Sequence, residues 1–230
     1  MRESGKLFPF FRGKVRIKQP KKHRVSVDLI LFLSKLRGVK RTSRVMDLGA
    51  GFGFLSIVIA KRWGCCVHAL ERDPLMISFL KENVELNSLG GKVKVVEGDL
   101  REVGKVYERG SFEVVVSNPP FFPKDYRRSD GGIHFESDTS LADFISASSH
   151  LLRDGGYLNL LVPSFRLHET FVYLERYKLP PRFLSVMYPT QSKGGKLCVV
   201  VSRKNVPGPL ELDRPLIINE GEGTYAGGGE

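Results

Sequence analysis

Cysteine is scarce in this sequence, which has three among 230 residues, two of them adjacent at Cys65 and Cys66. An odd number without metal-ligand spacing argues against both a disulfide framework and a structural zinc site. Long apolar runs are also missing, because those at residues 29–33 and 57–60 fall far short of the roughly 18–20 residues that span a bilayer. The basic N-terminus is not followed by an apolar signal core. We therefore expect a cytoplasmic protein with reduced thiols, no metal site and no membrane partner.

Acidic residues are nearly absent from the first 44 positions. This segment holds fourteen Lys or Arg residues but only Glu3 and Asp28 as acids, a charge of +12, whereas the remaining 186 residues sum to −1. Charge concentrated at one end of a chain indicates a polyanionic partner. A nucleic acid is favoured over a membrane, because the basic residues are interleaved with Pro and Gly and do not line an amphipathic helix. A solubilising tail is the alternative.

The order of predicted elements indicates the fold class. Residues 1–24 are predicted to be an irregular basic arm, in which residues 14–18 alternate as in a short hairpin or edge strand, and a helix is predicted from Ser26 to Gly38. Strand and helix patterns then alternate along the chain. Strands are predicted at residues 44–48, 66–71, 93–97, 112–117, 157–162, 182–188 and 197–203, and helices at residues 54–62, 73–90, 140–152 and 166–178. This alternation predicts an α/β, Rossmann-like fold, with a seven-stranded, mostly parallel sheet and helices on both faces.

The chain is predicted to have three regions. A basic arm at residues 1–24 precedes an α/β domain at residues 25–204, and a C-terminal extension rich in Gly, Pro and Glu, partly disordered, follows at residues 205–230. Ligands of open α/β sheets bind beyond the carboxyl ends of the strands. The residues that follow each predicted strand are therefore the candidates for a functional site.

The first candidate follows the strand at residues 44–48. Glycines recur there at alternate positions, Gly49, Gly51 and Gly53, and allow a ligand to approach the backbone. The dinucleotide-binding fingerprint needs its third glycine one residue later, at the position of Phe54, so a pyrophosphate ligand is disfavoured. Asp47 at the strand end adds a carboxylate, which suits an ammonium group and repels a pyrophosphate.

Acids follow the next two strands. Glu71 ends the strand at residues 66–71, and its two carboxylate oxygens match the vicinal hydroxyls of a ribose. A helix-start acid is the alternative role for this residue, but Asp73 fills that role better. Asp99 follows the third strand and can accept a hydrogen bond from an exocyclic amino group such as that of adenine, although a Gly-Asp pair alone is merely a turn.

The most specific feature is Asn118-Pro119-Pro120-Phe121, directly after the strand at residues 112–117. The two prolines restrict the backbone and direct the Asn118 side chain and the Pro119 carbonyl outwards. Both groups are hydrogen-bond acceptors, and together they suit the two N–H donors of a planar amino group. Phe121 offers a face on which a flat base or amide can stack. A Pro-Pro turn without chemistry is the alternative.

In this order, the four motifs resemble those of class I methyltransferases that use S-adenosylmethionine. The Asn-Pro-Pro-Phe sequence at residues 118–121 is typical of the subgroup that methylates planar nitrogens, either adenine N6 in nucleic acids or the side-chain amide of glutamine in proteins. Residues 19–28, 83–87 and 215–218 are also similar to the bacterial tRNA-1(Val) adenine-37 N6-methyltransferase family. This resemblance spans nearly the whole chain.

The resemblance implies a reaction and a set of site residues. The reaction is S-adenosylmethionine-dependent N6-methylation of an adenine in tRNA, at position 37 of a valine tRNA. The residues implied to bind the cofactor are Asp47, Gly49, Ala50, Gly51, Glu71, Arg72, Asp99, Leu100 and Asn118. Those implied to hold the target base are Asn118, Pro119, Pro120 and Phe121. The tRNA phosphates are expected to contact Lys14, Arg16, Lys18, Lys21, Lys22, Arg24, Lys124, Arg127 and Arg128.

Two other functions fit parts of the pattern. A protein glutamine N-methyltransferase has the same Asn-Pro-Pro pocket, but such enzymes carry a substantial helical domain where this chain has about 44 residues of basic sequence. A non-catalytic RNA-binding module that kept the fold would not need the set of Asp47, Glu71, Asp99 and Asn118. Titration with S-adenosylmethionine separates an enzyme from such a module.

Overall fold

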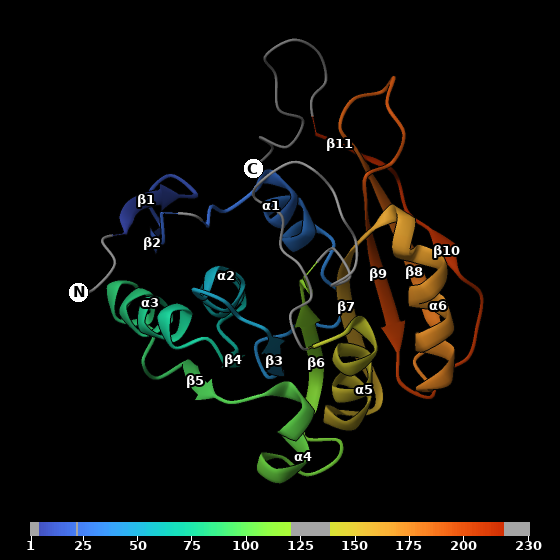
Figure 1. Ribbon diagram of the computed structural model, residues 1–230, viewed down its shortest axis with the longest axis horizontal. Helices are drawn as coiled ribbons and strands as arrows, with labels where there is room; N and C mark the ends of the chain where they lie inside the picture. The colour runs from blue at the N-terminus through green and yellow to red at the C-terminus, as the bar shows by residue number, and fades with distance from the viewer. Residues whose placement is uncertain (1–4, 22, 121–138, 219–230) are drawn as a thin grey trace.

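The computed structural model describes residues 5–21, 23–120 and 139–218 (Figure 1). The strands are β1 (Lys6–Phe10), β2 (Val15–Gln19), β3 (Arg44–Leu48), β4 (Cys66–Glu71), β5 (Val93–Glu97), β6 (Phe112–Ser117), β7 (Leu152–Pro163), β8 (Pro181–Tyr188), β9 (Leu197–Arg203), β10 (Glu211–Leu212) and β11 (Leu216–Ile217). The α-helices are α1 (Val27–Ser34), α2 (Phe54–Trp63), α3 (Pro74–Leu86), α4 (Val103–Val106), α5 (Leu141–Leu151) and α6 (Leu167–Arg176). Two 3-10 turns are η1 (Leu100–Glu102) and η2 (Ser164–Arg166).

The main sheet has the predicted Rossmann-like form. Its strand order is β10-β8-β9-β7-β6-β3-β4-β5, and β11 also pairs with β8. Strands β3 to β7 run parallel, and β9 lies antiparallel between β7 and β8. The seven predicted strands are all present, and the sheet gains β10 and β11 because two short segments of the C-terminal extension pair with β8. No helix in the described part of the chain is long and apolar enough to cross a membrane.

Helices cover both faces of this sheet (Figure 1). Neighbouring residues of a strand point to opposite faces, so Val45 packs with α1, α2, α3 and the N-terminal strands, whereas Met46 packs with α4, α5 and α6. In β6 the same alternation places Val114 in one core and Val115 in the other, and both are fully buried. Burial on both faces explains why the central strands are continuously apolar.

The basic arm is more regular than expected, because β1 and β2 form an antiparallel hairpin, and the hairpin or edge strand predicted at residues 14–18 is confirmed as β2. Val15 and Ile17 of β2 are buried in the core, so the alternation at residues 14–18 reflects packing. The free backbone edge of β2 is paired by side chains of α3. The Arg16 N–H donates to Asn87 Oδ1 at 3.0 Å, and Asn87 Nδ2 donates to the Arg16 carbonyl at 2.6 Å. The asparagine thus takes the place of a neighbouring strand.

The predicted helix from Ser26 to Gly38 is shorter in the structure, where α1 ends at Ser34. Beyond that point the backbone bonds to the main sheet instead. The Arg37 N–H donates to Asn159 Oδ1 at 2.8 Å, and Asn159 Nδ2 donates to the Arg37 carbonyl at 3.1 Å. The Arg37 backbone groups therefore bond to a buried asparagine of β7 and not to a further turn of the helix.

Asn83 joins the hairpin to the glycine segment that follows β3. Its Oδ1 accepts from the Lys18 N–H at 2.7 Å, and its Nδ2 donates to the carbonyls of Lys18 and Phe52, each at 2.9 Å. We predict that Asn83→Ala lowers the free energy of unfolding by about 3 kcal/mol, because three backbone groups lose their partner. Urea unfolding measures this loss. Glu82→Gln removes only a half-exposed ion pair to Lys18 and should cost under about 1 kcal/mol. Equal losses in the two variants would contradict the role of Asn83.

Candidate active site

A cavity of about 420 Å³ lies at the carboxyl ends of β3, β4, β5 and β6. Several predicted site residues line it, namely Gly49, Ala50, Gly51, Glu71, Arg72, Leu100, Asn118, Pro119 and Pro120. Arg24, predicted to contact RNA, also lines it. The parallel strands end at one edge of the sheet, so motifs far apart in the sequence meet there.

The glycine segment after β3 forms one wall of the cavity. Gly49 and Gly51 have φ angles of +73° and +54°, a conformation that favours glycine. A Cβ added at Gly51 would have no atom within 4 Å and would protrude into open space. The Gly51 N–H donates to Glu71 Oε2 at 2.8 Å. The first two motifs are therefore hydrogen-bonded to each other.

Asp47 lies behind this segment and is 1% exposed. Its Oδ2 accepts a hydrogen bond from the Ser56 hydroxyl at 2.6 Å, whereas its buried Oδ1 has no hydrogen-bond partner among residues 5–21, 23–120 and 139–218. Burial raises the pKa of this carboxyl to about 7, the Ser56 hydrogen bond opposes that shift and the nearby Glu71 charge adds to it. An unpartnered buried carboxylate oxygen is costly, and a cation brought close to it would offset that cost.

Glu71 is held in place by backbone donors. Its Oε1 accepts from the N–H groups of Arg72 and Asp73, at 2.8 and 2.9 Å. With the bond from Gly51, three N–H groups orient one carboxylate at the cavity wall. Each carboxylate oxygen has two lone-pair sites, so Oε1 is fully used and Oε2 can accept one further hydrogen bond from a ligand.

Asp99 does not line the cavity, although its neighbours Gly98 and Leu100 do. Its carboxylate contacts Arg101 at 2.6 Å and Arg72 at 3.4 Å. The hydrogen bond from Arg101 lowers the pKa of this carboxyl to about 2, with burial opposing and the charges of Arg101 and Arg72 adding. In this arrangement the Asp99 carboxylate forms ion pairs with two arginines. Its predicted contact with an adenine amino group stays a prediction.

Asn118 and Pro119 follow β6 at the rim of the same cavity. Asn118 Oδ1 is buried and has no hydrogen-bond partner among the described residues. The preceding residue is fixed, because the Ser117 hydroxyl donates to the Leu48 carbonyl at 2.8 Å. The site thus presents an oriented, unsatisfied acceptor to a ligand. Phe121, the fourth residue of the motif, lies outside the described residues.

The predicted RNA-contacting residues fall into two groups. Lys14, Arg16, Lys18, Lys21 and Arg24 belong to the hairpin and to the segment that leads from it to the cavity. The hairpin cations also have intramolecular partners, since Lys18 pairs with Glu82 at 2.7 Å and Arg16 donates to the Leu86 carbonyl at 3.2 Å. The others lie outside the described residues: Lys22, Lys124, Arg127 and Arg128.

Several cavity residues were not predicted. His23, Ser26 and Asp28 come from the segment before and within α1, and Thr139 and Phe144 from the start of α5. Residues 19–28 were singled out by the family resemblance, with Arg24 as an RNA contact and Ser26 as a helix start, and nothing in the sequence places them over the glycine segment. No local signal marks Thr139 or Phe144.

Comparison with known proteins agrees with this geometry. The family model described as the methyltransferase small domain matches residues 24–177. A tRNA1(Val) (adenine(37)-N6)-methyltransferase of Shewanella loihica is 25% identical over 161 residues, which cover 67% of this chain and 66% of the relative. A putative protein N5-glutamine methyltransferase of Methanocaldococcus jannaschii is 29% identical, with 63% of this chain and 74% of the relative covered.

A solved structure supports the fold assignment. TYW2 of M. jannaschii, determined in complex with AdoMet, superimposes with a TM-score of 0.59 at 20% identity, covering 88% of this chain and 86% of that chain. At this identity the likeness concerns the fold. The chain spans slightly less than two thirds of the length of the Shewanella relative.

Proposed function

Because the chain belongs to the methyltransferase small domain family, we propose that it methylates the N6 amino group of an adenine in tRNA, with S-adenosylmethionine as the methyl donor. Position 37 of a valine tRNA is the target that the resemblance in sequence suggests. The observation that carries the proposal is Asn118 Oδ1 at the rim of the cavity, a buried acceptor that has no partner in the described part of the chain. The N–H of an amino group is one donor that satisfies such an acceptor.

Three residues at or next to the cavity suit the cofactor. Asp47 Oδ1, which has no partner among the described residues, suits the ammonium group of the methionine end, and the open face of Gly51 leaves room for a ligand against the backbone. Glu71 is oriented by three N–H groups, and the remaining acceptor site on its Oε2 suits a ribose hydroxyl. When bound, S-adenosylmethionine supplies a methyl group activated by its sulfonium.

The residues after β6 act on the acceptor nitrogen. Adenine N6 is a poor nucleophile, because its lone pair is delocalised into the ring. Hydrogen bonds to Asn118 Oδ1 and to the Pro119 carbonyl favour a pyramidal nitrogen and stabilise the positive charge that develops on it. The methylated nitrogen is strongly acidic and loses a proton to water, so the site needs no dedicated general base. The protein's main contributions are alignment and exclusion of water.

An RNA loop suits this pocket better than a duplex. The target base must leave its stack to reach Asn118, and a loop base is already partly unstacked. Arg24 lies at the cavity and continues the basic hairpin segment, so phosphates next to the target base meet positive charge there.

Glutamine methylation in a protein is the second candidate. It is favoured by the 29% identity to the M. jannaschii relative named as a putative glutamine methyltransferase. A glutamine amide is also a planar amino group, so Asn118 and Pro119 suit it equally. The charge of +12 over residues 1–44 favours RNA over a protein.

The acceptor class can be tested directly. Methyl transfer from labelled S-adenosylmethionine is measured to unmodified tRNA transcripts, to duplex DNA and to a pool of glutamine-containing peptides. We expect label in tRNA alone. Label in the peptides would replace the proposal with the second candidate. Absence of label in every sample, with the cofactor still bound, would contradict both.

A further inference from the structure

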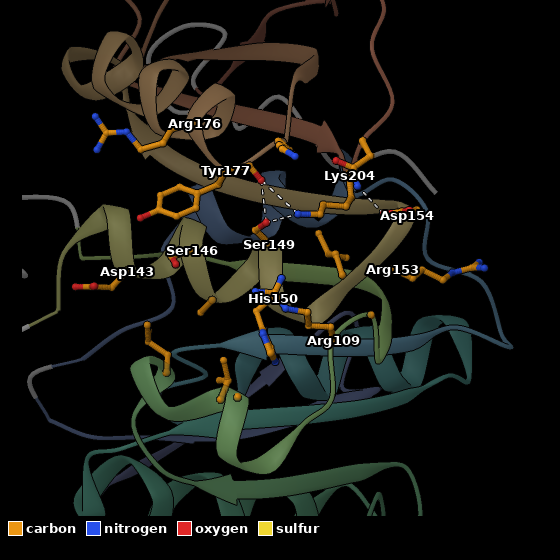
Figure 2. A pocket seen from close by; sticks show the side chains of 18 of the residues that line it. Arg109, Asp143, Ser146, Ser149, His150, Arg153, Asp154, Arg176, Tyr177 and Lys204 are labelled. Carbon is orange, nitrogen blue, oxygen red and sulfur yellow. Dashed lines mark hydrogen bonds between the residues drawn. The ribbon is translucent and has the colours of Figure 1, made fainter.

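A second cleft, of about 1000 Å³, is larger than the cavity at the carboxyl ends of the strands. Figure 2 shows side chains that line it. It lies among η1, α4, α5, the start of β7, the end of α6 and the residue after β9, and Leu100 lines both cavities. Arg109 and Gly110 precede β6, whereas Asn118 follows it. A strand of six residues spans about 20 Å, so this end of the cleft is remote from the target amine.

The cleft concentrates positive charge. Six Lys or Arg side chains and two Asp side chains line it, a balance of +4. Residues 45–230, to which all of these belong, sum to −1. General basicity of this part of the chain therefore does not account for the cleft. The six cations, which we call the cleft cations, are Arg101, Arg109, Arg153, Arg176, Lys178 and Lys204.

The two acids of the cleft accept hydrogen bonds from neutral groups. Asp143 accepts from the N–H and the hydroxyl of Ser140, each at 2.8 Å, in the capping box of α5. Asp154 accepts from the Asn205 side-chain amide at 2.6 Å. Arg109, Arg176 and Lys178 form no ion pair within the described part of the chain, and all three are exposed. Their charge is available to a ligand.

Lys204 forms part of the cleft wall and is 9% exposed (Figure 2). Its ammonium donates to the Ser149 hydroxyl and to the Tyr177 carbonyl, both neutral acceptors. Burial lowers the pKa of this lysine, and the charges of Arg109 and Lys178 lower it further, against the raising effect of Asp154. A nearly buried cation among other cations is unfavourable in the free protein, and an anionic ligand would relieve this.

We propose that this cleft binds backbone phosphates of the RNA substrate, at a part of the RNA remote from the target adenine. The inference rests on the proposed function, which takes tRNA as the substrate. The open cleft is larger than a single phosphate requires, and its cations come from four separate segments, which suits a strand carrying several phosphates. One RNA would then contact the cofactor edge through its loop and the cleft through its backbone.

Removal of three exposed cleft cations tests the proposal. Arg109→Gln, Arg176→Gln and Lys178→Gln are combined, and KM and kcat are measured with full-length tRNA and with a minimal stem-loop that carries the target adenine. We expect KM for tRNA to rise about tenfold or more with kcat unchanged, and KM for the stem-loop to stay within about twofold. The salt slope of tRNA binding should become shallower by about two to three, one phosphate contact per cation.

Matched controls separate the outcomes. The triple variant Arg41→Gln, Lys92→Gln, Lys94→Gln removes the same charge from exposed positions outside the cleft and should leave KM for tRNA within about twofold. Equal loss in both triple variants, equal loss with both RNAs, or no loss would overturn the cleft as an RNA site. Saturable binding of inorganic phosphate or ATP that is lost in the cleft variant, without any change in tRNA binding, would also overturn it.

The failure of the proposed function has a different signature. In that case the parent protein methylates neither RNA. The cleft proposal instead predicts that the cleft variant weakens the interaction with full-length tRNA more than that with the stem-loop. Fluorescence anisotropy with labelled tRNA then tests whether the cleft binds RNA, because it measures tRNA affinity independently of methyl transfer. Unaltered tRNA affinity in the cleft variant, or no tRNA binding by the parent protein, would contradict the proposal.

Discussion

Replacing Asn118 with alanine should lower kcat for methyl transfer by about 100- to 1,000-fold, while the dissociation constant for S-adenosylmethionine stays within a few-fold. The reason is the position of Asn118 Oδ1, a buried acceptor with no partner among the described residues, at the rim of the cavity. Its loss leaves the amine N–H unpaired and the developing charge on nitrogen unsupported. Single-turnover kinetics and calorimetric titration measure the two quantities separately.

The opposite end of the same strand offers a control. Ser111→Ala removes a hydroxyl that donates to the Glu108 carbonyl at 2.7 Å, just before β6 begins. Both kcat and cofactor affinity should be unchanged within about twofold. A parallel loss of catalysis and cofactor binding in Asn118→Ala would show that Asn118 holds the cofactor rather than the amine.

Asp47→Asn should stabilise the free protein at neutral and alkaline pH. The folded-state pKa of about 7 lies above the ordinary aspartate value of 3.8. A raised carboxyl pKa means that the folded state binds the proton more tightly, so stability falls as pH rises from about 4 to about 7. The full penalty above pH 7 is on the order of 4 kcal/mol. We expect a gain of about 1–3 kcal/mol at pH 8 and a smaller gain at pH 5, from urea unfolding.

The same substitution should weaken cofactor binding by about 100-fold, because the ammonium group loses its ionic partner. For the parent protein, affinity for S-adenosylmethionine should rise with pH up to about 7 and then level off, since the ionised carboxylate is the binding form. This dependence should vanish in Asp47→Asn. Titration of both proteins between pH 5 and 8 checks it.

Asp213 serves as a control for Asp47, because its carboxyl pKa is lowered and not raised. Burial opposes the shift, but its hydrogen bond to Lys35 and the charges of Lys35 and Arg37 lower the pKa of this group overall. Asp213→Asn should therefore give no gain in stability at pH 8, and cofactor affinity should be unchanged. A gain equal to that of Asp47→Asn would mean that burial of Asp47 is not the cause.

The central sheet could be predicted from sequence, because its strands are short apolar runs between strong helix signals. Asp73 illustrates this, since its side chain accepts from the N–H groups of Leu75 and Met76 and begins α3 as the Asp-Pro pair predicts. The hairpin could not be predicted in full. Strand β1 is largely exposed and contains Pro9, so it has neither apolar alternation nor a continuous donor pattern. The hairpin is held by tertiary contacts, in which Asn83 and Asn87 hydrogen-bond to the backbone of β2.

The candidate site was predictable only where a motif follows a strand directly. The positions after β3, β4 and β6 lie at the cavity as the topology requires, and their roles toward a ligand stay predictions. The orientation of Asp99 toward Arg101 and Arg72 depends on side chains that the spacing does not reveal. The cleft cations come from four segments far apart in sequence, and no local pattern joins them.

Nucleoside mass spectrometry tests the central claim most directly. An unmodified valine tRNA transcript is incubated with the protein and S-adenosylmethionine and then digested to nucleosides, with Asn118→Ala as the inactive control. We expect N6-methyladenosine in the parent sample, mapped by fragment analysis to position 37, and none with the variant. A methyl group found on another nucleoside, or N6-methyladenosine at equal levels with Asn118→Ala, would contradict it.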